Sequence, residues 1–182
     1  MANARIDLVL TVIGPDRPGL VELLSKTVTG NQGNWESSRM ARMAGRFAGI
    51  LRVSAAAEDA DRLGQALAGL EGQGLRVVVE RAAPAGQPAS PTRLLRVELV
   101  GNDRPGLIRD VSSALADRGI NVEELATEVT DAPMAGGMLL KVTVHVRAAR
   151  ELSADALRQV LEARATDFLV DVAAAAEPGD PS

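Results

Sequence analysis

The chain contains no cysteine and no tyrosine, and its single histidine is His145. Without cysteine it has no disulfide, no thiolate nucleophile and no zinc–thiolate site. One histidine supplies little of the acid–base and ligand chemistry on which many enzymes and metal sites depend. We therefore expect no catalytic residues, no metal and no cofactor, and we interpret the protein as a non-enzyme. A catalytic site built on serine or aspartate is the alternative that composition leaves open.

Aromatic residues and long apolar runs are also scarce. Trp35, Phe47 and Phe168 are the only aromatic residues, so a platform that stacks single-stranded nucleic acid is not expected. The sequence has no run of about 18 apolar residues, the length that a membrane-spanning helix needs. Residues 1–5 lack the basic and then apolar layout of a secretory signal. We expect a cytoplasmic protein that does not bind membranes.

Positive charge is in deficit, with 20 lysines and arginines against 24 acidic residues and a formal charge of −4. Proteins that bind duplex DNA normally carry a basic surface, so we expect no direct binding to nucleic acid. Arg39, Arg42, Arg46 and Arg52 form the densest basic run. Their spacing on a hairpin of strands predicts that they divide between two faces, which favours a solvated strand edge over a groove for phosphates.

The most informative feature of the sequence is an internal repeat. Residues 14–20 read GPDRPGL and residues 101–107 read GNDRPGL. Downstream, the triplet NWE at 34–36 corresponds to NVE at 121–123. Further on, MAG at 43–45 corresponds to MAG at 134–136, which places a four-residue insertion around Thr130 to Pro133 in the second copy. The chain is therefore one structural unit written twice.

The repeat divides the chain into two domains, which we place at residues 5–81 and 93–172. Residues 82–92 contain three prolines and no large apolar residue, so we expect a partly extended linker there. Residues 173–182 are small, acidic and proline-ended, as is typical of a frayed tail.

Hydrophobic periodicity predicts the same elements in both copies. Alternating apolar residues indicate strands, and apolar residues three or four positions apart indicate helices. In the first copy the pattern predicts a strand at Ile6 to Thr11, a helix on Leu20, Leu24 and Val28 that ends near Gly30, strands at 34–44 and 47–57, a helix on Leu63, Leu67 and Leu70, and a strand at 75–80. In the second copy it predicts a strand on Leu95, Val97 and Leu99, a helix on Leu107, Val111 and Leu115 that ends near Gly119, strands at 120–130 and 137–147, a helix on Leu157, Val160 and Leu161, and a strand at 168–172.

The order βαββαβ predicts two ferredoxin-like units of the α+β class. Each unit is expected to have a four-stranded antiparallel sheet with two helices on one face. A unit of about 80 residues is only marginally stable alone, and its sheet has unpaired edges. We therefore expect the two copies to pack together and the chain to form a homodimer.

The repeated turn lies where the first strand meets the first helix. Backbone N–H groups at the start of a helix are unpaired and carry partial positive charge, which suits the carboxylate of an amino acid. Gly19 and Gly106 allow a ligand to approach the backbone, because glycine has no Cβ. Asn34 and Asn121 begin the following strand, which we expect to lie near the turn, and each side-chain amide can orient a zwitterion.

A structural interpretation of the same residues stands beside this one. Asp16 and Asp103 can cap the helices, with the prolines in the first helical turn. The arginines of the turn would then face solvent or pair with acidic neighbours, and the asparagines would satisfy local hydrogen bonds.

The DRPGL turn, the later asparagine and the βαββαβ order resemble the ACT domain, over both copies. A tandem of ACT domains without a catalytic domain is similar to the glycine cleavage system transcriptional repressor family. Residues 34–45 (NWESSRMARMAG) resemble the first repeat of that family, and the run NVEEL from Asn121 resembles the second. Trp35, which stands where the second copy has Val122, and the insertion near Pro133 depart from a strict repeat, so two ligand sites need not be equivalent.

The resemblance implies a regulatory protein that binds an amino acid, with glycine and serine favoured, at interfaces between ACT units. It also implies action through a protein partner such as a transcription activator. The implied ligand-binding residues are Asp16, Arg17, Pro18, Gly19, Leu20 and Asn34, with Asp103, Arg104, Pro105, Gly106, Leu107 and Asn121 in the second copy. Two alternatives remain: an ACT scaffold that dimerises without a ligand, and a regulatory subunit of an enzyme of amino-acid metabolism.

Overall fold

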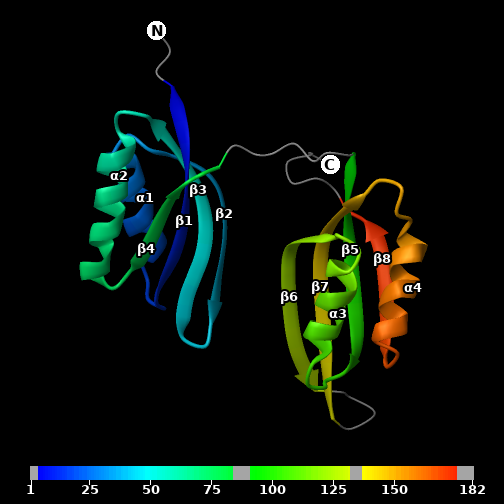
Figure 1. The fold of residues 1–182 in the computed structure, drawn as a ribbon. Coiled ribbons are helices and arrows are strands. Elements are labelled where there is room, and N and C mark those ends of the chain that lie inside the picture. Colours follow the sequence, from blue (N-terminus) through cyan, green and yellow to red (C-terminus); the bar gives the residue numbers. More distant parts are fainter. Residues whose placement is uncertain (1–3, 84–90, 132–136, 176–182) are drawn as a thin grey trace. The chain divides into compact units, whose positions relative to one another are not determined.

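The computed structural model describes residues 4–83, 91–131 and 137–175, and the chain divides into two compact units, residues 1–86 (unit 1) and 87–182 (unit 2). Unit 1 contains β1 (Arg5–Pro15), α1 (Leu20–Gly30), β2 (Asn34–Met43), β3 (Arg46–Ala56), α2 (Ala60–Ala68), the 3-10 helix η1 (Gly69–Gln73) and β4 (Arg76–Arg81). Unit 2 contains β5 (Thr92–Asn102), α3 (Leu107–Ala116), β6 (Asn121–Asp131), β7 (Met138–Ala149), α4 (Ala154–Arg164) and β8 (Phe168–Ala174). The predicted order βαββαβ is confirmed in both units (Figure 1).

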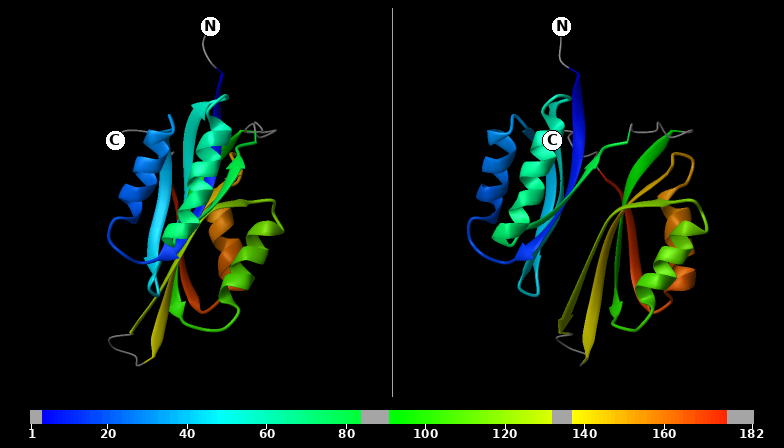
Figure 2. Two further views of the ribbon diagram at one scale, coloured as in Figure 1. Left: turned by 90° about the vertical axis from the view of Figure 1, so that its left-hand side faces the viewer. Right: turned by 60° about the vertical axis from the view of Figure 1, so that its left-hand side comes forward.

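Each unit is a four-stranded antiparallel sheet with two helices on one face. The strand order is β2-β3-β1-β4 in unit 1 and β6-β7-β5-β8 in unit 2. In Figure 2 the two helices of each unit lie together against one side of their sheet. The predicted ferredoxin-like fold is therefore confirmed, and the side of each sheet without helices is called the open face below.

The core of unit 1 lies between its sheet and its helices. Leu10 from β1 and Leu51 from β3 are buried together with Leu24 of α1 and Leu63 and Leu67 of α2. These leucines carry the periodicity that predicted the elements, because alternate strand positions and every third or fourth helix position face the same side. The apolar residues that predicted the helices of unit 1 are thus the residues that those segments bury in the core.

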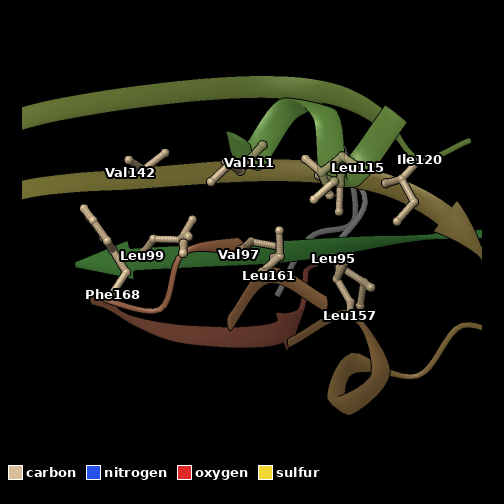
Figure 3. Packing of buried hydrophobic residues seen from close by; sticks show 14 of the residues in the cluster. Leu95, Val97, Leu99, Val111, Leu115, Ile120, Val142, Leu157, Leu161 and Phe168 are labelled. Carbon is tan, nitrogen blue, oxygen red and sulfur yellow. The ribbon is translucent and has the colours of Figure 1, made fainter. Parts of the chain in front are cut away.

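Unit 2 repeats this core with its own residues. Figure 3 shows Leu95, Val97 and Leu99 of β5 together with side chains of both helices, among them Leu115 and Leu161. All five are almost completely buried. Each unit therefore has a separate hydrophobic core, as expected for two independent domains.

Several element boundaries differ from the prediction, and Leu70 lies in η1 and not in α2. β1 continues through Gly14 to Pro15, since both residues keep their pairing with β3. Thr92, placed in the linker, is the first residue of β5, and β8 runs to Ala174, two residues into the predicted tail. Flanking pairs in the sheet extend each strand beyond its apolar pattern. Residues 84–90 and 176–182, which include most of the linker and of the tail, lie outside the described residues. So do residues 132–136, whereas Thr130 and Asp131 of the insertion belong to β6.

Candidate functional site

The first glycine of each repeated turn permits a close packing of two backbone segments. A Cβ atom on Gly14 would lie 2.8 Å from the carbonyl oxygen of Gly74, and one on Gly101 would lie 2.6 Å from that of Asp167. Gly74 and Asp167 both belong to the segment that precedes the last strand of their unit. This glycine therefore has a structural role, because any other residue would push that segment away from the sheet.

The second glycine of the turn starts the helix in a left-handed conformation. Gly19 and Gly106 are the N-cap residues of α1 and α3, which begin at Leu20 and Leu107, and φ is 88° at both. No side chain accepts a capping hydrogen bond at either helix. The first backbone N–H groups of both helices are thus left without a side-chain cap, which produces a place that favours a negative charge.

The prediction that aspartate caps these helices, with proline in the first helical turn, is wrong. Asp16 and Pro18 precede the left-handed Gly19 and so lie outside α1. The carboxylate of Asp16 instead pairs with Arg42 of β2, with 2.8 Å between Oδ2 and Nε. The backbone N–H of Asp16 donates to the carbonyl oxygen of Gly45 over 3.0 Å. These contacts join the turn to the hairpin between β2 and β3.

The turn of unit 2 is held by the same kind of backbone contact. The backbone N–H of Asp103 donates to the carbonyl oxygen of Met138 over 3.0 Å. The two turns thus share an anchored backbone, although the sequences that they contact differ.

The arginines of the two turns have different partners. Arg17 Nη2 donates to the carbonyl oxygen of Gln73 over 2.7 Å. Arg104 Nη1 lies 3.0 Å from Oδ2 of Asp110 in the first turn of α3. The hydrogen bond from Arg104, and after it the one from Arg109, lowers the pKa of the Asp110 carboxyl below its usual value. Both expected alternatives therefore occur: Arg104 pairs with an acidic neighbour, and Arg17 is exposed to solvent.

The expectation that Asn34 lies near the turn of its own unit is wrong. Asn34 pairs with Ser54, and Ser54 pairs with Asp7 near the start of β1, whereas the turn follows Pro15 at the end of β1. At about 3.3 Å per residue, about 26 Å separate Asp7 from Pro15. Because β1 and β2 are both antiparallel to β3, which lies between them, they run in the same direction. The start of β2 therefore lies at the same end of the sheet as the start of β1 and cannot reach the end of β1.

The second asparagine is placed in the same way. Asn121 pairs with Arg147, and Arg147 pairs with Leu94 near the start of β5, while the turn of unit 2 follows Asn102. In neither unit does the structure bring the asparagine and the turn together.

The asparagines instead belong to a cluster at a β-bulge that the sequence did not single out. Asn34 Nδ2 donates to Glu36 Oε1 over 2.9 Å, and Ser54 Oγ donates to the same oxygen over 2.5 Å. Arg5 Nη2 donates to Ser54 Oγ, and Ser54 is only 4% exposed. The hydrogen bonds from Ser54 and Asn34 lower the pKa of the Glu36 carboxyl. Unit 1 therefore holds an ionised carboxylate beside the asparagine.

Unit 2 places a carboxylate at the matching bulge. Asn121 Nδ2 lies 3.4 Å from Glu123 Oε1, and Arg147 Nε donates to that oxygen over 3.0 Å. The register of each sheet shifts at this point, between Trp35 and Ser37 and between residues 122 and 124. The matched NWE and NVE triplets were the signal in the sequence, since they aligned the glutamates as well as the asparagines.

Of the predicted basic run, three arginines share one face. Arg39, Arg46 and Arg52 lie on the open face of unit 1, since they alternate with the buried Leu51 or pair with residues that do. Arg42 lies on the other face, where it contacts Asp16. The predicted division of these arginines between two faces is therefore confirmed, with three on one face and one on the other.

The described ranges contain no helix long and apolar enough to cross a membrane. Nor do they contain a group of three or more potential metal ligands from histidine, cysteine and acidic residues. The single histidine, His145, lies beside one acidic side chain, with 3.5 Å between its Nδ1 and Glu124 Oε2.

Comparison with known proteins identifies the repeated unit. The ACT domain family matches residues 7–80 and again residues 95–164. The glycine cleavage system transcriptional repressor of Escherichia coli is 28% identical over 167 residues, which cover 88% of this chain and 85% of that protein. The repressor of the same name from Shigella flexneri matches equally well.

Solved structures show the same fold over nearly the whole chain. A crystal structure of an unknown protein from Galdieria sulphuraria has a TM-score of 0.83 and 29% identity, covering 95% of this chain and all of that one. A structure described as a candidate glycine cleavage system transcriptional repressor has a TM-score of 0.67 and 21% identity, covering 93% and 96%. The chain belongs to the ACT domain family, as two ACT domains in tandem.

Proposed function

We propose that this chain is a regulatory protein that binds a small amino acid, glycine or serine, and that it controls transcription through a protein partner. The observation that carries the proposal is the turn formed twice by the GPDRPGL and GNDRPGL motifs. In both units it ends in a left-handed glycine and an uncapped helix start. Membership of the ACT family and the similarity to a transcriptional repressor support a regulatory role.

The uncapped backbone would hold the carboxylate of the amino acid. The first N–H groups of α1 and α3 point out of the helix start, where Gly19 is exposed and Gly106 is partly exposed. A carboxylate at such a point gains hydrogen bonds and a favourable interaction with the helix dipole. Asp16, Arg17, Pro18 and Leu20, with their counterparts in unit 2, would then shape and position this turn.

Asn34 and Asn121 can serve the same ligand only when the turn and the asparagine come from different ACT units, because each unit separates them by the length of a strand. The proposal therefore requires that ACT units associate to complete a site. In such a site the amide of Asn34 and the ionised Glu36 beside it would present an acceptor surface to the ammonium group.

A partner-mediated action fits the charge of the chain. The formal charge is −4, and a protein of this sign has a weak electrostatic attraction to DNA. We infer that the regulator acts on a protein, and that it catalyses no reaction itself.

A thermal-shift screen of the amino acids tests the proposed function. A ligand that binds the folded state raises the melting temperature, and the rise grows with the logarithm of the ligand concentration above Kd. We expect glycine or serine to raise it in a concentration-dependent manner. D-serine is the matched control, because it has the same composition and the opposite geometry at Cα. No shift with any of the common amino acids at millimolar concentration would contradict an amino-acid-binding role.

A further inference from the structure

A hollow of about 400 Å3 lies at the end of the unit 1 sheet, beside the turn but on the open face. Ile13 lies between the two flanking strands, because it pairs with Arg76 of β4 and with Ala48 of β3. Arg46, which pairs with Pro15, stands on the other side. The hollow thus has an apolar residue between two arginines, and 44% of Ile13 is exposed to solvent.

The positive charge of this hollow is poorly compensated. Within the part of the chain that the structure describes, the guanidinium group of Arg46 makes no hydrogen bond and no ion pair. Arg76 Nε lies 3.7 Å from Glu71 Oε1, and both side chains are about 70% exposed. An ion pair that is so open contributes little. The hollow therefore carries at least one full positive charge that no described acidic residue neutralises.

Unit 2 shows that the fold does not require these arginines. Leu139 pairs with Asn102 as Arg46 pairs with Pro15, and Leu169 pairs with Val100 as Arg76 pairs with Ile13. The same two positions are therefore leucines in the second copy. The two cations around the hollow are therefore specific to the first copy and are not needed for the fold.

The geometry points to a binding site for a small organic anion, with one carboxylate or phosphate group, between Arg46 and Arg76. Guanidinium groups bind both kinds of anion through paired N–H donors. Ile13 would contact the apolar part of the ligand. This inference goes beyond the proposed function, because it requires neither the amino acid at the helix start nor the protein partner.

The size of the site and the charge of the chain favour a small anion over nucleic acid. A duplex needs a row of phosphate contacts, whereas only two arginines line this hollow. The rest of the open face carries Asp7 and Glu80 as well as Arg39 and Arg52, and Arg52 Nη1 lies 3.6 Å from Asp7 Oδ2. This face is therefore not a continuous row of cations.

Titration of inorganic phosphate and of butyrate into the full chain at low ionic strength, followed by the arginine Nε–H signals in NMR, tests the site. We expect shifts at Arg46 and Arg76, and about tenfold weaker binding for Arg46→Gln or Arg76→Gln, because each variant removes a charge-assisted contact. Glu71→Gln should strengthen binding, since it removes the opposing charge. Arg158→Gln, at an exposed arginine of α4 in unit 2, is the matched control and should bind both anions unchanged.

Unchanged binding in the folded Arg46→Gln, Arg76→Gln double variant would overturn the inference. So would a duplex oligonucleotide that displaces phosphate from the native chain. The double variant should keep its thermal shift with glycine or serine, so failure of the anion site and failure of the proposed function are separate results.

Discussion

Gly19 and Gly106 adopt the same left-handed backbone conformation, with φ of 88° at both positions. The space around them differs. A Cβ atom on Gly19 would meet nothing within 4 Å, whereas one on Gly106 would lie 3.1 Å from Nη2 of Arg109, the end of a flexible side chain. Any substitution at either position therefore acts through the backbone and through what approaches from outside, more than through the surrounding protein.

Replacing Gly19 or Gly106 with valine is expected to obstruct the proposed amino-acid site and also to strain the turn. A left-handed conformation costs about 1–2 kcal/mol for a residue with a Cβ atom. Gly119→Val is the control, because Gly119 is also left-handed, has open space around it and lies at the other end of α3. Calorimetry should show lost binding for the first two variants and retained binding for the control, with folding checked by circular dichroism. Undiminished binding in the folded Gly19→Val, Gly106→Val double variant would rule out the site at the helix start.

Gly14→Ala is expected to lower the free energy of unfolding without any involvement of a ligand. Its new methyl group would meet the carbonyl oxygen of Gly74 at 2.8 Å, and overpacking of this kind costs about 1–3 kcal/mol. Gly30→Ala should be neutral or stabilising, because open space surrounds that position and alanine favours a helix. Urea denaturation measures both. Equal stability of the two variants would show that the close approach at Gly14 is not needed.

The ion pair between Arg104 and Asp110 predicts a pH dependence. The pKa of Asp110 is lower in the folded protein than its usual value, so its contribution to stability is complete at neutral pH. That contribution is lost as the pH falls through the lowered pKa. Asp110→Asn should therefore reduce the loss of stability between neutral and acidic pH, as measured by urea denaturation of the native and variant chains. A variant that follows the native curve would contradict this role.

The folded chain is expected to be a homodimer in solution. Leu169 is 81% exposed and Met43 is 74% exposed, and an interface would remove such apolar surface from water. The edge strands of small sheets also tend to be covered. Light scattering should give the mass of two chains at micromolar concentration. A mass of one chain throughout that range would count against the dimer.

The sequence was sufficient for the fold because local and tertiary preferences agree in the core. The alternating leucines of β1 and the helical positions Leu20, Leu24 and Val28 correctly predicted which side of each element is buried. The repeat then confirmed the order, since two copies with different residues gave one pattern.

The site was harder to predict because it depends on register and direction. The sequence places Asn34 soon after the turn, yet β2 begins at the far end of the sheet. The cap was misassigned for a related reason: aspartate and proline favour a helix start in general, and only the left-handed Gly19 shows that this helix begins later. The hydrogen bond from Ser54 to Glu36 was not predicted, because it forms at a β-bulge and no local sequence pattern indicates a bulge there.

Calorimetric titration of glycine and of serine into the native chain and into the Asn34→Ala, Asn121→Ala double variant tests the central claim most directly. Each asparagine should contribute about 0.5–1.5 kcal/mol of binding free energy through its hydrogen bonds. The single variants should differ, because half-buried Trp35 stands beside Asn34 and the smaller Val122 beside Asn121. The account predicts saturable binding of one of the two amino acids to the native chain and weaker binding to the double variant. Absence of binding to a folded native chain, or equal affinity in the two proteins, would contradict it.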